Sequence, residues 1–294
     1  MELAQKTLFF LKMTTLYQQN ISLDLIRSFE DVCSLGEGIN LNKNDSAWVD
    51  INNNRIHANV NSFYNSYDIK SKPSVIFQIK NNEILYGADS GIVKYDLDNF
   101  IEKILLNIDD IHNFLQYRSN DGGYCCGFKY LSFMHRYEPH KYPGYIYKIS
   151  EEGWELIDNT VHIPNTFIEI ENGKLLISDS FKREVWLYEF NKDGNLVNKD
   201  LWKIFEQGSI PDGGCKVDNF ILIALWDNGS IATLDINGNE LCRLPISAIR
   251  PTNCKYHEND KHLWVTSASE GLSQSMLEKF PLSGKTMVYK LNTN

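Results

Sequence analysis

The sequence predicts an all-β protein and, more specifically, a six-bladed β-propeller. Short runs of β-branched and aromatic residues recur along the chain, and turn residues separate them. Six of these runs lie about 40–47 residues apart, which is the period of a four-stranded propeller blade. A β-sandwich is disfavoured, because its turn signals would not group into repeats of this length.

The elements follow in order along the chain. Residues 1–20 lack strand-like alternation, so we expect an N-terminal extension there, as a short helix or a disordered segment, with the propeller over residues 21–294. The six periodic runs each end in or near a small or acidic residue, and they are 47–50, 85–89, 130–133, 175–179, 221–226 and 263–267. A second strand-like run follows each of them, at 55–60, 91–96, 144–149, 184–190, 229–234 and 287–291.

Composition excludes several classes of function. The net charge of −9 and the absence of a Lys/Arg-rich run argue against a nucleic-acid partner, and no apolar run is long enough to span a membrane. The six cysteines form no Cys-x-x-Cys pair, which argues against structural zinc and against a disulfide framework. We therefore expect reduced thiols, a cytoplasmic location and a small-molecule ligand, whereas the oligomeric state is left open.

Four loop segments carry oxygen ligands of the kind that a hard divalent cation takes. Glu37 lies between two glycines, Asn120 precedes Asp-Gly, Asn165 follows a proline, and Asp212 lies in Pro-Asp-Gly. Taken alone, each segment is better explained without a ligand: Pro-Asp-Gly and Asn-Asp-Gly as turns, Glu37 as a solvated loop carboxylate, and Asn165 as the start of a strand. In a propeller, however, the loops that enter the innermost strands gather at one mouth of the central channel, so these distant residues could meet there.

Several short motifs of the chain also occur in the same order in a known protein family. The motifs include Gly-Glu-Gly at 36–38, Arg-Ser-Asn-Asp-Gly at 118–122, Ser-Asp-Ser at 178–180 and Pro-Asp-Gly at 211–213. Further matches are residues 48–51, 165, 224–226, 250–253 and 265–268, so that residues 30–270 are covered. In this order they resemble the family of senescence marker protein (regucalcin), gluconolactonases and the luciferin-regenerating enzyme, which are six-bladed, metal-dependent propellers.

The resemblance implies roles for particular residues. Glu37, Asn165 and Asp212 would bind one divalent cation, and Asp212 would also be the general base. Arg118 and Asn120 would bind the substrate.

A glutamate after the Met-ending strand also belongs to the family's substrate pocket, and Glu138 is the nearest candidate here. Two departures from the family pattern stand out. Thr166 replaces the glycine that usually follows the metal-binding asparagine, and Phe133 replaces the threonine of Gly-Thr-Met. We expect both side chains to add bulk near the pocket and to affect substrate identity.

The expected function is therefore metal-dependent hydrolysis of a sugar lactone such as gluconolactone. The ion could be Ca²⁺, Zn²⁺, Mg²⁺ or Mn²⁺, because oxygen-rich sites accept all four. Two alternatives remain open at this point. One is a calcium-binding regulatory propeller without turnover, and the other is a metal-dependent hydrolase of another ester, such as an organophosphate. A serine nucleophile elbow is excluded, because the chain contains no Gly-x-Ser-x-Gly.

Overall fold

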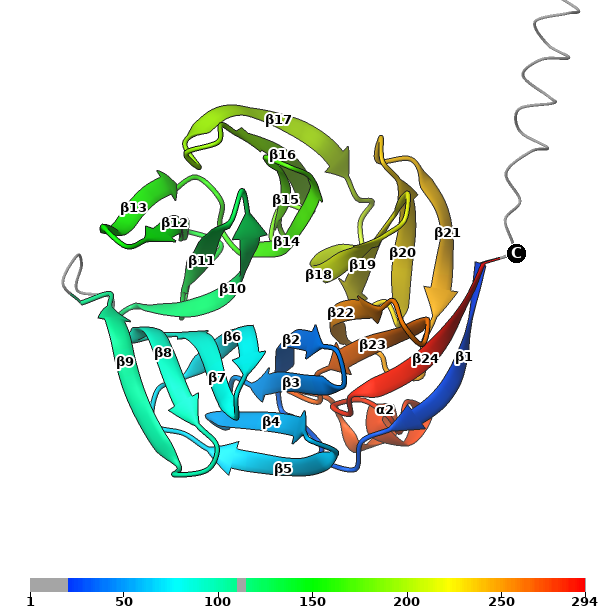
Figure 1. The fold of residues 1–294 in the computed structure, drawn as a ribbon. Helices are drawn as coiled ribbons and strands as arrows, with labels where there is room; N and C mark the ends of the chain where they lie inside the picture. The colour runs from blue at the N-terminus through cyan, green and yellow to red at the C-terminus, as the bar shows by residue number, and fades with distance from the viewer. Residues whose placement is uncertain (1–20, 110–114, 294) are drawn as a thin grey trace, which may run out of the picture.

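The computed structural model describes residues 21–109 and 115–293, and these fold into six four-stranded antiparallel sheets arranged as a ring (Figure 1). The predicted six-bladed β-propeller is confirmed. The predicted extension at residues 1–20 lies outside the described residues.

Each sheet is one blade, with its strands in order from the innermost to the outermost. Blade 1 contains β2 (Gly36–Asn42), β3 (Asp45–Asp50), β4 (Arg55–Val60) and β5 (Phe63–Asp68). Blade 2 contains β6 (Pro73–Lys80), β7 (Glu83–Ala88), β8 (Gly91–Asp96) and β9 (Ile101–Asn107). Blade 3 contains β10 (Tyr117–Cys125), β11 (Phe128–His135), β12 (Tyr145–Ser150) and β13 (Gly153–Asp158).

The remaining three blades follow the same plan. Blade 4 contains β14 (Pro164–Glu171), β15 (Lys174–Asp179), β16 (Glu184–Phe190) and β17 (Leu196–Ile204). Blade 5 contains β18 (Ile210–Val217), β19 (Phe220–Trp226), β20 (Ser230–Asp235) and β21 (Glu240–Pro245). Blade 6 contains β22 (Pro251–His257), β23 (His262–Ser267), β24 (Met287–Thr293) and β1 (Ile21–Ser28).

The periodic runs of the sequence form the second strand of every blade, and the runs that follow them form the third. Runs 55–60, 91–96 and 184–190 coincide with β4, β8 and β16. These middle strands are flanked by a strand on each side and by another blade on each face. The second strands, such as β15 and β19, are therefore buried almost continuously, which made them the strongest strand signal.

The core of the described residues lies between neighbouring blades. Val49 and Ile56 of blade 1, for example, pack in one cluster with Ile84 and Val93 of blade 2, and comparable clusters fill the other inter-blade spaces. Burying each such side chain contributes about 1.5–3 kcal/mol. The ring thus buries both faces of each sheet and holds the innermost strands around a common axis.

Aspartates at the ends of second strands hold in place the loops that lead into the innermost strands. The Asp50 carboxylate accepts hydrogen bonds from the backbone N–H groups of Ser34 (2.8 Å) and Leu35 (3.1 Å), just before β2. The Asp179 carboxylate accepts one from the N–H of His162 (2.9 Å), just before β14. These carboxylates satisfy buried donors and place the first residues of the innermost strands.

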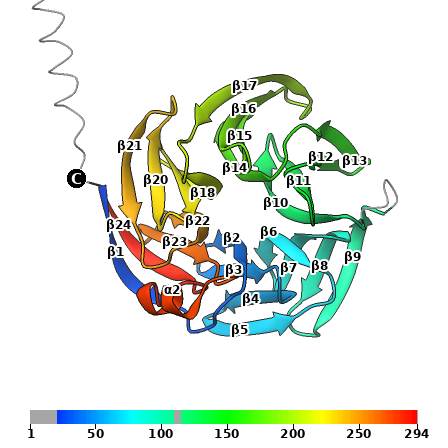
Figure 2. The same cartoon turned by 180° about the vertical axis from the view of Figure 1, so that it is seen from behind.

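Blade 6 closes the ring, because it combines the first described strand with the last. β1 pairs antiparallel with β24, and Ile21 lies opposite Thr293. The short helix α2 (Gln274–Lys279) lies at the edge of the ring beside this blade (Figure 2). None of the helices in the described part of the chain has the length and apolar character that crossing a membrane requires.

Candidate functional site

The proposed ligand residues lie where innermost strands begin, at bulges in their pairing with second strands. The register shifts after Glu37 in β2, after Asn165 in β14, and after Pro211, directly before Asp212, in β18. β10 shows the same irregularity around Asn120. A bulge changes the direction of side chains relative to the regular pleat. It can therefore turn these polar groups towards the centre of the ring.

A cavity of about 350 Å³ collects these residues. Its polar lining comes from Glu37, Arg118, Asn120, Asn165, Ser180, Arg183, Asp212 and Glu270. Its apolar lining comes from Leu35, Ile51, Met134, Ile163, Phe181, Ile210 and Trp226. Five of the six residues that the sequence indicated therefore line one cavity.

Two carboxyl groups lie side by side in this cavity. Glu37 and Asp212 are each 6% exposed, and their side chains are close enough to share a hydrogen bond. Burial, reinforced by the carboxylates of Asp212 and Asp121, raises the pKa of Glu37 well above its usual range. Burial and the Asp121 carboxylate raise the pKa of Asp212 in the same way. Two buried like charges are unfavourable, so this pair requires either a proton or a cation.

A chain of hydrogen bonds fixes the carboxamide beside them. The Asn120 amide nitrogen donates to Asn165 Oδ1 (2.8 Å) and to the carbonyl of Pro164 (2.9 Å). Asn165 Nδ2 donates to Ser180 Oγ (2.9 Å), which donates to the carbonyl of Pro211 (2.6 Å). The orientation of Asn165 is therefore determined, and one lone pair of its carbonyl oxygen remains available.

The donor set fits a hard divalent cation. Asp212 Oδ1 is buried and has no hydrogen-bond partner among the described residues, which is unfavourable unless a ligand satisfies it. Glu37 and Asp212 supply two negative charges, and Asn165 supplies a neutral carbonyl oxygen. Oxygen ligands of this kind, with room for water and substrate, match Ca²⁺ and Mg²⁺ chemistry.

Arg118 and Asn120 provide groups that a substrate could contact. Arg118 lines the cavity and donates from Nη1 to the carbonyl of Ser119 (3.0 Å). Asn120 uses its amide N–H groups on Asn165 and Pro164, so that its carbonyl oxygen is the part left for a ligand.

Glu138 lies elsewhere. It does not line the cavity, its side chain is 45% exposed, and its carboxylate lies 3.7 Å from the ammonium group of Lys141. The loop after β11 carries it away from the channel, and Met134 occupies the position on the cavity wall. We therefore assign Glu138 no role in the function proposed below.

The expected bulk of Phe133 and Thr166 also falls outside the cavity lining. Phe133 is fully buried in the core between blades 2 and 3, because consecutive residues of β11 point to opposite faces and Met134 takes the cavity side. Thr166 is buried as well, and its hydroxyl donates to the carbonyl of Asp212. Thr166 thus connects β14 to β18 beneath the site.

The cavity wall also contains residues at or just after the ends of second strands, and the sequence had not indicated these as site residues. Arg183 and Phe181 lie in the turn between β15 and β16, Trp226 ends β19, and Glu270 follows β23. A signal was present, because an antiparallel second strand ends at the face where the innermost strand begins. The turns that follow the second strands must therefore lie at the same mouth of the central channel as the starts of the innermost strands.

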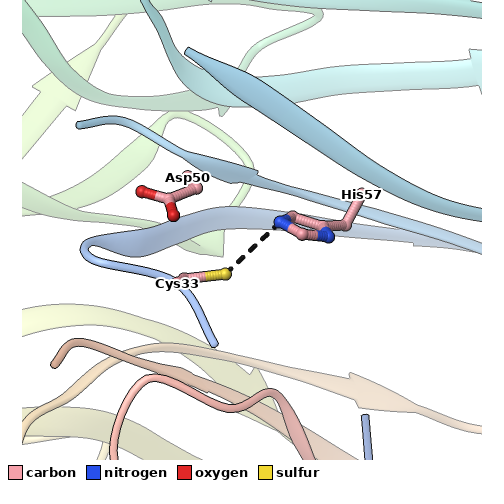
Figure 3. A group of neighbouring side chains, drawn as sticks. All are labelled: Cys33, Asp50 and His57. Atoms are coloured by element: carbon pink, nitrogen blue, oxygen red, sulfur yellow. Dashed lines mark hydrogen bonds between the residues drawn. The ribbon is translucent and has the colours of Figure 1, made fainter. Parts of the chain in front are cut away.

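A second group of potential metal ligands lies in blade 1, where Cys33, Asp50 and His57 come together (Figure 3). Cys33 Sγ lies 3.5 Å from His57 Nε2. Both oxygens of Asp50 already accept backbone and Asn53 N–H groups. Burial, followed by the charge of Asp50, raises the pKa of the Cys33 thiol. We interpret the group as part of the core.

Comparison with known proteins agrees with this architecture. The model of the SMP-30/Gluconolactonase/LRE-like region matches residues 35–269, so the chain belongs to this family. Regucalcin of Gallus gallus is 27% identical over 111 residues, a stretch that covers 36% of this chain and 37% of that protein. The sequence match therefore spans little more than a third of that relative.

Solved structures share the fold. A calcium-binding protein, regucalcin, from Agrobacterium tumefaciens superimposes with a TM-score of 0.83 at 19% identity, covering 92% of this chain and 95% of that chain. The luciferin-regenerating enzyme gives a TM-score of 0.80 at 18% identity, with the same coverage of 92% and 95%. At such low identity these likenesses establish the propeller fold alone.

Proposed function

We propose that this protein hydrolyses a sugar lactone of the gluconolactone type with the help of one divalent cation. The observation that carries the proposal is the buried pair Glu37 and Asp212, with an unpartnered Asp212 Oδ1 among the described residues, beside the fixed carbonyl of Asn165. Membership of a family that includes gluconolactonases supports the same chemistry.

Glu37, Asn165 and Asp212 would hold the ion, which when bound supplies a Lewis acid that polarises the lactone carbonyl. The Asp212 carboxylate accepts the proton of the attacking water and returns it to the ring oxygen when the acyl C–O bond breaks. Arg118 donates hydrogen bonds to the substrate's oxygen atoms, and the Asn120 carbonyl accepts one from a hydroxyl group. Both side chains orient the lactone ring, which lowers the entropic part of the barrier.

Lactone turnover with and without a chelator tests the proposal. We expect turnover of gluconolactone to stop after metal removal and to return when Ca²⁺, Mg²⁺, Mn²⁺ or Zn²⁺ is added singly. The Asp212→Ala variant should lose about a thousandfold or more in kcat/KM, because it removes both a ligand and the base. Glu138→Ala is the matched control, since it removes a carboxylate outside the cavity, and its kcat/KM should be unchanged. Full activity of Asp212→Ala after complete metal removal would exclude the mechanism.

A calcium-binding protein without turnover is the second candidate. The exclusively oxygen-based donor set favours it. So does the apolar part of the cavity lining, because six of its seven side chains, all but Trp226, offer no hydrogen bond to a sugar. Tight Ca²⁺ binding with no hydrolysis across a panel of lactones would support this candidate. The panel should include phosphotriesters, because faster turnover of these would instead indicate an organophosphate hydrolase.

We also infer a cytoplasmic location. All six cysteines of the chain are free thiols in the structure, and reduced thiols are typical of reducing compartments. Fractionation of cells that express the full chain tests this inference, and recovery from the secreted fraction would contradict it.

A further inference from the structure

Arg183 stands out among the residues of the cavity wall. It lines the cavity, and its Nε atom is buried without a hydrogen-bond partner in the described part of the chain. Several arginines outside the cavity are paired with carboxylates: Arg136 forms an ion pair with Asp89, and Arg243 lies 3.0 Å from the carboxylate of Glu206. A buried guanidinium nitrogen without a partner is unfavourable unless a ligand supplies the acceptor.

The backbone holds Arg183 at a fixed place on the wall. The Asp179 carboxylate accepts a hydrogen bond from the N–H of Phe181 (3.1 Å), which fixes the turn after β15. The carbonyl of Arg183 accepts one from the N–H of Phe205 (2.8 Å). Its φ of +61° is unusual for a residue other than glycine, and such conformations gather at functional sites.

The charges of the cavity favour an anionic ligand. Glu37 and Asp212 offset the two charges of a bound divalent ion. Among the other residues of the lining, the guanidinium groups of Arg118 and Arg183 outnumber the one remaining carboxylate, that of Glu270, which forms no ion pair with either of them among the described residues. Two nearby carboxylates lie outside the lining: Asp89 pairs with Arg136, and Asp121 is buried beside Glu37 and Asp212. The lining of the loaded cavity would therefore present more positive than negative groups to a ligand.

We propose that Arg183 determines substrate specificity by binding an oxyanion group, a carboxylate or a phosphate ester, on the substrate. The inference rests on the proposed function for the reaction and adds the substrate class: lactones of sugar acids that carry a second acidic group. The guanidinium group presents two parallel N–H donors that match a carboxylate or phosphate, and Arg118 lies in the same cavity to contact the rest of the molecule.

Binding measurements test this inference independently of turnover. The metal-loaded protein is titrated in a calorimeter with gluconate, glucarate and 6-phosphogluconate, which differ only in the group at the far end of the chain. We expect one of the two doubly acidic ligands to bind about tenfold to a hundredfold more tightly than gluconate, and the stronger one identifies the oxyanion. Arg183→Gln should abolish this difference, and Arg183→Lys should retain part of it.

Arg243→Gln is the matched control, because it removes a guanidinium group outside the cavity, and the preference should persist. Equal binding of all three ligands by the unmodified protein, or an undiminished preference in Arg183→Gln, would overturn the inference.

A kinetic comparison separates this inference from the proposed function. The five-membered lactones of gluconate and glucarate share a ring and differ in one terminal group. Arg183→Gln should raise KM for the glucarate lactone about tenfold and leave KM for the gluconate lactone unchanged. A binding preference without turnover of either lactone would refute lactone hydrolysis and leave the role of Arg183 supported. Turnover of both lactones with equal KM values would refute the role of Arg183 alone.

Discussion

At the scale of single residues, Thr166 shows how the site depends on an unusual backbone conformation. Its φ is +61°, a region that β-branched residues rarely adopt, and its hydroxyl donates to the carbonyl of Asp212. The family resemblance led us to expect glycine at this position, and glycine would adopt this φ without strain. The hydroxyl offsets this strain by linking the two strands that carry Asn165 and Asp212.

We expect Thr166→Gly to be more stable than Thr166→Ala by about 1 kcal/mol, because alanine keeps the strained φ and both variants lose the hydroxyl. Urea unfolding of the two variants measures the difference. Thr233, a buried residue of β20 whose φ is not positive, is the control, and there alanine should be the more stable by about 1 kcal/mol. An alanine variant at position 166 as stable as the glycine variant would contradict the interpretation.

At the scale of elements, neighbouring blades are joined by polar contacts as well as by apolar packing. Asp158 ends β13 of blade 3, and its Oδ2 accepts hydrogen bonds from Tyr188 Oη (2.5 Å) of β16 and from Lys199 Nζ (2.6 Å) of β17. Burial by itself raises the pKa of Asp158. The hydrogen bonds from Lys199, Tyr188 and Thr160 outweigh burial, so the pKa is lowered overall.

Because the folded pKa of Asp158 lies below its ordinary value of 3.8, the ionised form stabilises the fold above that pH. This stabilisation is lost as the pH falls below 3.8 through the folded pKa. Asp158→Asn should lower the free energy of unfolding by about 3 kcal/mol at pH 7, since Lys199 loses its counter-ion. The variant's free energy of unfolding should also fall less steeply than that of the unmodified protein as the pH decreases. Urea unfolding between about pH 7 and pH 3 measures both effects. The exposed Asp193→Asn is the control, and an equal loss in both variants would count against the argument.

At the scale of the whole molecule, the ring is held closed by pairing between the two ends of the described chain. β1 and β24 are antiparallel neighbours, and Asn292 Nδ2 lies 3.4 Å from Ser22 Oγ. All other blades consist of strands that are consecutive in sequence. This pairing attaches the first described strand to the last blade, in addition to the packing of Trp264 and Val288 of blade 6 against Ile39 and Trp48 of blade 1.

A disulfide between cysteines introduced at Ser22 and Asn292 should stabilise the protein by about 2–4 kcal/mol, because it closes nearly the entire described chain into one loop. Thermal unfolding with and without a reducing agent measures the effect, and the reduced double variant is its own control. If oxidation left the midpoint unchanged, separation of β1 and β24 would not be the step that limits stability.

The sequence by itself determined the strand content, the number of blades and the order of the motifs. Second strands such as β15 and β19 are apolar at most positions, which makes their period visible without any tertiary information. Glu37, Asn120, Asn165 and Asp212 were identifiable because a propeller brings the beginnings of its innermost strands together. Their roles as ligands remain predictions, which metal removal and substitution test.

Only the tertiary structure decided which other side chains reach the cavity. The family resemblance suggested Glu138, yet the loop after β11 leads outwards and Met134 takes that place. Arg183 was overlooked, because its position depends on how the turn after β15 lies across the channel mouth. The physical reason is that alternation along a strand assigns residues to two faces, whereas the packing of neighbouring blades decides what each face meets.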